Sequence, residues 1–220
     1  MSLSVDLAPW FGPVRDQGPR GTCLAFAVTA AHEWSRQYRR GVSTDLSEEY
    51  LYWASKGVDG NRSSGTSCQS MASALLNTGQ CEATSWPYRG DTDEASSGYG
   101  PPAVGVHLRR ASLTRRSTSA IDDIRAHLDS GAVSVLVIDV WKQFYKPVFG
   151  VLTTPTPADL LAARHAVVAV GYSASDSHLL IRNSWSATWG NNGHALMPFA
   201  AWAIAGINAW VVDDDVDPYA

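Results

Sequence analysis

The sequence predicts an α+β fold in which the helices come first and the strands second. An apolar segment over about residues 22–40 leaves hardly any polar face, which is typical of a buried helix. Beyond about residue 130 the pattern changes to short runs rich in β-branched residues. Helical patterns that precede strand patterns are typical of an α+β domain, and the 220 residues are enough for a sizeable core.

The first helix is expected to start at Thr22 or Cys23 and to run to about Arg40. The Thr22 hydroxyl can cap its first turn. Gly41 is expected to end it, because glycine readily adopts the left-handed conformation of a helix C-terminus. Further helices are predicted over residues 47–54, 69–77 and 121–128, and strands over residues 132–138, 166–172, 178–182 and 194–197.

Net charge and hydropathy indicate which kinds of partner are not expected. The formal net charge is −4 and no basic cluster occurs, so we expect no nucleic-acid partner. No apolar run reaches the roughly 18 residues of a membrane helix, and no charged-then-apolar leader opens the chain. The sequence leaves both a cytoplasmic and an exported location open, and it does not encode the oligomeric state in any readable motif.

The three cysteines are Cys23, Cys68 and Cys81. The helix predicted over residues 69–77 holds Cys68 and Cys81 roughly 15 Å apart. A disulfide needs Cα atoms within about 7 Å, so we expect no bond between these two and few or no disulfides in the chain. Because neither Cys-x-x-Cys nor His-x-x-x-His spacing occurs, we also expect no metal site. No phosphate-binding glycine loop occurs either, and we expect no cofactor.

Cys23 is the strongest candidate for a nucleophile. A polar, glycine-rich loop leads directly into it, and it falls in the first turn of the predicted helix, where the helix dipole favours a thiolate. A cysteine nucleophile also needs a base and a group that orients the base. His165, at the head of an apolar strand, and Asn183, after the next strand, are the candidates for these roles.

Three blocks of sequence together resemble the papain-like cysteine proteases. That family reads Gln-Gly-x-x-Gly-x-Cys at its nucleophile, His-Ala at its base and Asn-Ser-Trp-x-x-x-Trp-Gly-x-x-Gly near its end. Residues 17–23, 165–166 and 183–193 match these blocks in order, and the spacing of 142 residues from Cys23 to His165 is close to that of the family. The resemblance covers nearly the whole chain, from Val5 to about Val212.

The resemblance implies a single catalytic domain over residues 1–220, with a two-lobe fold and an active site in the cleft between the lobes. The helical lobe would span about residues 14–105. An antiparallel, barrel-like β lobe would span about residues 106–212, with the N-terminal arm crossing over to it. Because only 16 residues precede Gln17, we expect no inhibitory propeptide of the kind that papain-like zymogens carry.

The resemblance also implies a role for each motif residue. Cys23 would be the nucleophile, His165 the base and later the acid, and Asn183 the residue that orients His165. Gln17 would form the oxyanion hole together with the backbone N–H of Cys23, and Trp185 would cover the contact between Asn183 and His165. The sequence departs from the family at Leu24, where tryptophan is usual, and at Arg20, where some relatives have a disulfide cysteine.

The candidates for the substrate cleft are Gly21, Gln69, Met71, Leu136 and Arg164. Two readings of Arg164 are open. In a regular strand it points to the face opposite His165 and is a solvated charge. At a frayed strand entry it lies on the cleft rim and favours acidic substrate side chains.

Three functions fit the motifs. The first is a peptidase that hydrolyses peptide bonds through a Cys23 thioester. The second is an amidase or acyltransferase that uses the same thioester. The third is a catalytically silent peptide-binding domain, which the complete set of motif residues disfavours. In each case the expected partner is a peptide or protein, and the expected chemistry in the first two is nucleophilic catalysis by a thiol.

Overall fold

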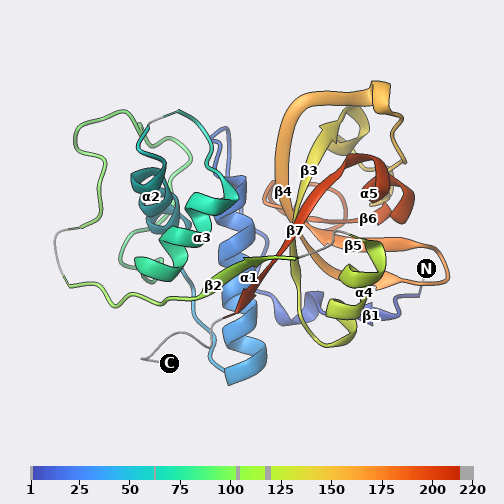
Figure 1. The fold of residues 1–220 in the computed structure, drawn as a ribbon, viewed down its shortest axis with the longest axis horizontal. Helices are drawn as coiled ribbons and strands as arrows, with labels where there is room; N and C mark the ends of the chain where they lie inside the picture. Colours follow the sequence, from blue (N-terminus) through green and yellow to red (C-terminus); the bar gives the residue numbers. More distant parts are fainter. Residues whose placement is uncertain (1, 62, 103–104, 117–119, 214–220) are drawn as a thin grey trace. The chain divides into compact units, whose positions relative to one another are not determined.

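A computed structural model describes residues 2–61, 63–102, 105–116 and 120–213. The chain forms two compact units. The helical unit contains residues 17–114 and 212–220, and the strand unit contains residues 1–16 and 115–211. Figure 1 shows helices α1 to α3 in the first and the long strands in the second, so the predicted α+β class is confirmed.

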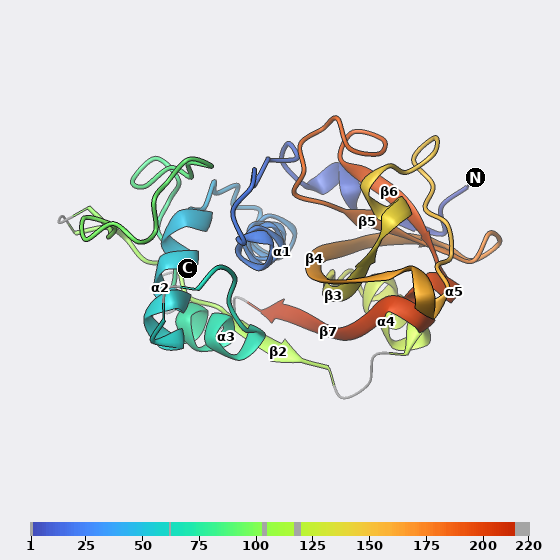
Figure 2. The ribbon, with the colours of Figure 1, turned by 90° about the horizontal axis from the view of Figure 1, so that it is seen from above.

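The described residues of the helical unit form the helices α1 (Cys23–Arg40), α2 (Glu48–Asp59) and α3 (Cys68–Asn77). α2 and α3 lie side by side (Figure 2), and both contact α1. The short strand β2 (Ser112–Arg115) follows at the end of the unit. The side of α1 that faces the other helices is apolar, and most of its first fourteen residues are buried, as its composition predicted.

The ends of these helices follow from local chemistry. Ser47 and Ser67 each accept a backbone N–H in the first turn of α2 and α3, at 3.0 Å from Tyr50 and Ser70. Gly41 ends α1 as predicted, with a φ of 65°. α2 runs five residues beyond the predicted end and stops at a second left-handed glycine.

The prediction that the Thr22 side chain caps α1 is wrong. Thr22 occupies the N-cap position, but its hydroxyl makes no capping hydrogen bond. The hydroxyl instead lies 2.9 Å from the Tyr88 hydroxyl, to which it is hydrogen-bonded. A tertiary contact 66 residues away therefore replaces the local one.

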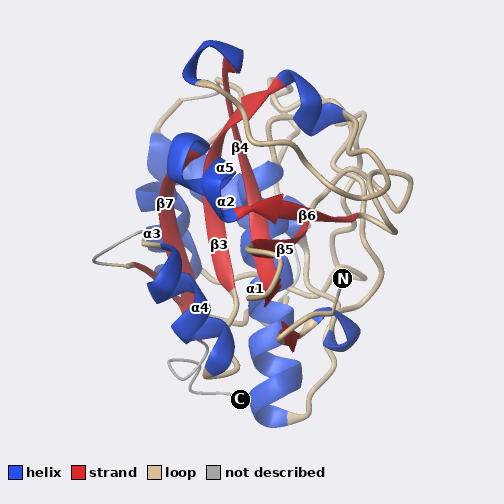
Figure 3. Ribbon diagram, turned by 90° about the vertical axis from the view of Figure 1, so that its right-hand side faces the viewer, coloured by secondary structure: helices blue, strands red, loops and turns tan. Residues whose placement is uncertain are grey.

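The strand unit is an antiparallel sheet in which β7 (Gly206–Asp213), β3 (Ser134–Trp141), β4 (Leu160–Ser173), β5 (His178–Arg182) and β6 (His194–Pro198) follow one another in that order. The short strand β1 (Val5–Asp6) pairs with β4. Figure 3 shows β3 between β7 and β4. Helices α4 and α5 pack on the sheet, α4 against β4 and β3, and α5 against β3 and β6. Further elements of this unit are η1 (Ala8–Trp10), α4 (Ile121–Asp129), η2 (Lys142–Tyr145), η3 (Pro157–Asp159) and α5 (Phe199–Ala205).

β4 is the central strand of the sheet. Residues 165–173 of β4 are all buried, which explains why this segment reads as a continuous apolar run. β4 starts six residues before the predicted strand because its exposed first part still pairs with the end of β3. α5 and β7 were not predicted, since neither segment carries a clean helical or alternating pattern.

Two further expectations concern the cysteines and membrane helices. Cys23, Cys68 and Cys81 form no disulfide, so the prediction for Cys68 and Cys81 is confirmed. Within the described residues, no helix has the length and hydropathy needed to cross a membrane.

Candidate active site

His165 and Asn183 come from two paired strands of the central sheet. His165 lies in β4, opposite Ile138 of β3, and Asn183 directly follows β5. Because β4 and β5 are antiparallel neighbours, with Val168 opposite Arg182, the two side chains meet. His165 Nε2 lies 2.6 Å from Asn183 Oδ1, within hydrogen-bonding distance.

A second hydrogen bond decides which nitrogen of His165 carries the proton. The backbone N–H of Ser184 donates to the same Asn183 Oδ1 at 2.8 Å. This oxygen is therefore the acceptor for the imidazole, and Nε2 must be the donor. In the neutral ring, Nδ1 then has the lone pair and is the atom that can accept a proton.

Burial controls the charge of His165. The side chain is only 5% exposed, and burial lowers its pKa to about 4, while the hydrogen bond to Asn183 acts in the opposite direction. At neutral pH the imidazole is therefore uncharged unless a negative group approaches it. A neutral, fixed imidazole with its lone pair on Nδ1 is in the form required of a general base.

Aromatic rings enclose the imidazole. The ring centroid of Trp185 lies 4.6 Å from that of His165, and Phe144 lies 5.7 Å away in an edge-to-face arrangement. Tyr145 stacks on Trp185 with an interplanar angle of 11°, and Trp189 Nε1 donates to the Phe144 carbonyl at 3.0 Å. A hydrogen bond in such an apolar environment is stronger than one in water.

The segment around Cys23 lies in the helical unit. Cys23 is the first residue of α1 and is partly exposed. Gln17 is buried, and its side-chain Nε2 donates to the Arg20 carbonyl at 2.9 Å. The Tyr88 hydroxyl donates to the Gln17 backbone carbonyl at 2.6 Å, so hydrogen bonds hold both the side-chain amide and the backbone of Gln17.

The substrate-cleft candidates fall into two groups. Gly21 packs so tightly against the next loop that an added Cβ would lie 2.4 Å from Ser64 Oγ, and Gln69 is exposed in the first turn of α3. Met71 and Leu136 are 0% exposed. Both belong to the core of their units and offer a peptide no surface, so the expectation that they line a cleft needs correction.

The position of Arg164 agrees with the interpretation that it lies in a regular strand as a solvated charge. It lies in register with Asp139 on β3, one residue before His165, and its side chain is 73% exposed. Its Nε lies 3.6 Å from the Asp139 carboxylate. The cation is therefore partly balanced by a cross-strand acid, which weakens the case for a role in substrate recognition.

Two residues that support the site were not predicted from the sequence. Phe144, 0% exposed, contacts both His165 and Trp185 from the short helix η2. Arg20 was noted only as a departure from the family, yet it is a buried cation with two acidic partners. A buried arginine in a loop is recognisable only once its partners, far away in the sequence, are known.

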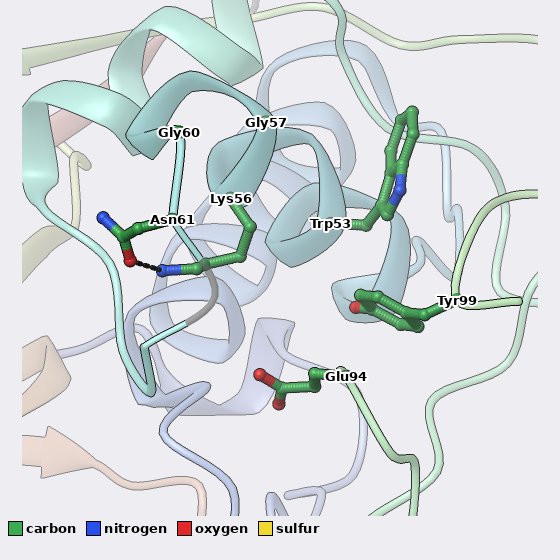
Figure 4. Close-up of a pocket in the computed structure, with 7 residues that line it drawn as sticks. All are labelled: Trp53, Lys56, Gly57, Gly60, Asn61, Glu94 and Tyr99. Atoms are coloured by element: carbon green, nitrogen blue, oxygen red, sulfur yellow. Dashed lines mark hydrogen bonds between the residues drawn. The ribbon is translucent and has the colours of Figure 1, made fainter. Parts of the chain in front are cut away.

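The helical unit also contains a pocket of about 270 Å³ beside α2 (Figure 4). Trp53, Lys56, Glu94 and Tyr99 contribute to its wall, and Lys56 donates to Asn61 at 3.1 Å. None of the motif residues lines this pocket.

Comparison with known proteins agrees with the motifs and the fold. Residues 4–211 match the family model described as papain family cysteine protease. Cathepsin K of Gallus gallus is 28% identical over 84% of this chain, which spans 54% of that protein. An uncharacterised peptidase C1-like protein of Acanthamoeba polyphaga mimivirus is 25% identical, over 92% of this chain and 70% of its own length.

Among solved structures, xylellain, a cysteine protease from Xylella fastidiosa, superposes with a TM-score of 0.82 at 26% identity. The match covers 96% of this chain and 87% of xylellain. The family model covers nearly the whole chain, and the family that it describes is one of cysteine proteases, which are hydrolases. The chain therefore belongs to the papain family of cysteine proteases.

Proposed function

We propose that this chain hydrolyses peptide bonds through a thioester on Cys23, with His165 as base and acid. The observation that carries the proposal is the fixed tautomer of His165, because Asn183 holds the Nε2 proton and leaves Nδ1 as the basic atom. Membership of the papain family supports the same assignment.

The reaction would run in two stages. In the first, Cys23 passes its proton to His165 Nδ1 and its sulfur attacks the peptide carbonyl carbon. The carbonyl oxygen becomes an oxyanion, which the Gln17 amide and the Cys23 backbone N–H stabilise; such a donor is worth roughly 10²–10³ in rate in other enzymes. His165 then gives the proton to the leaving nitrogen as the C–N bond breaks, and a thioester remains.

Water completes the second stage. It attacks the thioester carbon while His165 takes one of its protons, and the sulfur leaves and is protonated again. The acid product carries the oxygen of that water. Papain-type chemistry usually begins from a thiolate and an imidazolium, whereas burial of His165 opposes its positive charge. In this proposal the negative thiolate offsets that effect and raises the pKa of His165.

A peptide library tests the proposal. The protein is incubated with the library with and without an added amine, and the products are identified by mass spectrometry. We expect hydrolysed products from the native chain and from Cys68→Ala, the matched control, and none from Cys23→Ala.

Two other outcomes would overturn the assignment as a hydrolase. Products that carry the added amine and no free acid would show an acyltransferase. Peptides that bind without being cleaved would show a silent binding domain.

A further inference from the structure

A buried arginine lies three residues before the proposed nucleophile. Arg20 is only 8% exposed. A buried guanidinium is costly unless its donors are satisfied, so its partners indicate what this residue does.

The guanidinium of Arg20 is fully engaged. Its two terminal nitrogens donate to the two oxygens of Glu49, at 2.6 and 2.8 Å. Nε donates to Glu94 at 2.7 Å, and Nη1 donates to the Arg89 carbonyl at 2.8 Å. Such a bidentate, charge-assisted arrangement fixes the plane of the guanidinium as well as its position.

Three tyrosines contact the guanidinium of Arg20 or its acidic partners. We call these residues together the Arg20 cluster: Arg20, Glu49, Glu94, Tyr52, Tyr88 and Tyr99. Tyr99 donates to Glu49 at 2.7 Å, and Tyr52 donates to Glu94 at 2.9 Å. The guanidinium also lies over the Tyr88 ring, 4.9 Å from its centroid, and over the Tyr52 ring at 5.6 Å. Figure 4 draws Glu94 and Tyr99, which in the sequence follow Arg89 by five and ten residues.

The Arg20 cluster joins three segments that are distant in the sequence. Glu49 and Tyr52 belong to α2, and Glu94 and Tyr99 to the segment 74 and 79 residues beyond Arg20. Because the two acidic partners, Glu49 and Glu94, lie on different segments, the side chain of Arg20 cannot move without breaking contacts to one segment or the other.

The backbone of Arg20 carries this constraint to the proposed oxyanion hole. The Arg20 carbonyl accepts from Gln17 Nε2 at 2.9 Å and from the Thr22 backbone N–H at 2.8 Å. Tyr88, whose ring lies under the guanidinium, donates to the Gln17 carbonyl and is hydrogen-bonded to Thr22. The orientation of the Gln17 amide thus depends on the position of Arg20.

We propose that Arg20, held by Glu49 and Glu94, is a positioning residue that orients the Gln17 amide toward the reacting carbonyl oxygen. The proposal rests on the proposed function, since it assigns Arg20 a part in that reaction. Arg20 itself touches no reacting atom. Its removal should slow the formation of the oxyanion and leave substrate binding and the reactivity of the thiol nearly unchanged.

The test uses Arg20→Lys, which keeps the positive charge and loses the bidentate geometry. We expect kcat to fall about 10- to 100-fold, part of the effect of losing an oxyanion donor, and KM to change less than about twofold. Alkylation of Cys23 by iodoacetamide forms no oxyanion, so its rate should stay within about twofold. Arg39→Lys, in an exposed ion pair with Asp213, is the matched control and should leave kcat unchanged.

A double-mutant cycle distinguishes positioning from general stabilisation. If Arg20 acts through Gln17, then Gln17→Ala should cost much less in the Arg20→Lys protein than in the native protein. Independent, multiplying effects of the two substitutions would overturn the proposal, and so would a native kcat in Arg20→Lys.

Two milder variants keep the test decisive if Arg20→Lys fails to fold. Glu94→Gln removes one charge of the Arg20 cluster, and Tyr88→Phe removes the hydroxyl that holds the Gln17 carbonyl. Each should lower kcat at constant KM, and native kcat in both would overturn the proposal. A native chain that cleaves no peptide would instead overturn the proposed function, and with it the role of Arg20.

Discussion

Replacement of Asn183 by alanine should remove most activity and leave the fold in place. The change deletes the acceptor of the 2.6 Å hydrogen bond from His165 and leaves the imidazole free to rotate or to change tautomer. Both side chains are only 5% exposed, so water cannot readily take the place of Asn183. Loss of one partner from a buried hydrogen bond costs about 1–3 kcal/mol.

If this cost falls on the transition state, kcat should drop roughly 5- to 150-fold. The folded protein should also lose about 1–3 kcal/mol of stability, because His165 Nε2 and the Ser184 N–H lose their acceptor. The fold should persist, because Trp185 and Phe144 continue to pack on the imidazole. We would measure kcat, KM and the thermal midpoint of Asn183→Ala beside the native chain. Full activity in a folded Asn183→Ala protein would refute the claim that Asn183 orients His165.

Asn183→Asp provides the conservative comparison. It keeps an acceptor for His165 Nε2 and adds a negative charge, which favours the imidazolium and raises the pKa of His165. The limb of the pH–rate profile that reports the titration of His165 should therefore shift to higher pH. An unchanged profile would show that residue 183 does not interact with the base during catalysis.

Three further predictions concern Trp185, His32 and Arg164. Trp185→Ala should lower both activity and stability. The free energy of unfolding, measured in urea, should fall by about 2 kcal/mol, which is less than the loss of a fully buried tryptophan because Trp185 is partly exposed. Native stability would contradict the packing of Trp185 on His165. His32 is buried against Gln80, which lies 2.7 Å from its Nδ1, and burial lowers its pKa to about 3. Below pH 6.5 the unfolded chain therefore binds a proton at His32 that the folded chain does not bind. Between pH 7 and pH 5 the native protein should lose about 2 kcal/mol more stability than His32→Asn. Equal losses in the two proteins would contradict this prediction. Arg164→Glu should alter any preference for acidic substrate residues less than about twofold in a peptide library, because Asp139 already balances the native cation; a large change would return Arg164 to the substrate site.

Much of the fold could be predicted from local patterns. Gly41 ends α1 as expected, and the strand predicted over residues 178–182 has the bounds of β5. α5 and β7 escaped because seven helical residues and a strand with mixed burial leave too weak a period to recognise. The prediction that Thr22 caps α1 was wrong because its hydroxyl is hydrogen-bonded to Tyr88, which is distant in the sequence.

Some features of the candidate site could be predicted from the sequence, and others could not. His165 and Asn183 were identified from short motifs, and antiparallel pairing of their strands then brings them into contact. The tautomer depends on one backbone N–H, that of Ser184, whose direction no pattern encodes. The Arg20 cluster depends on acids 29 and 74 residues away, and only tertiary structure can show which of the 21 acidic residues they are.

Selective alkylation of Cys23 tests the central claim most directly. The protein is treated with iodoacetamide at pH 6, the three cysteines are mapped by mass spectrometry, and peptidase activity is followed in the same samples. Cys81 should stay unmodified, since it is 0% exposed and burial raises its pKa. We predict that Cys23 is labelled well before Cys68, and that activity is lost in proportion to that single modification. Equal labelling of the three thiols, or full activity after Cys23 is alkylated, would contradict Cys23 as the nucleophile.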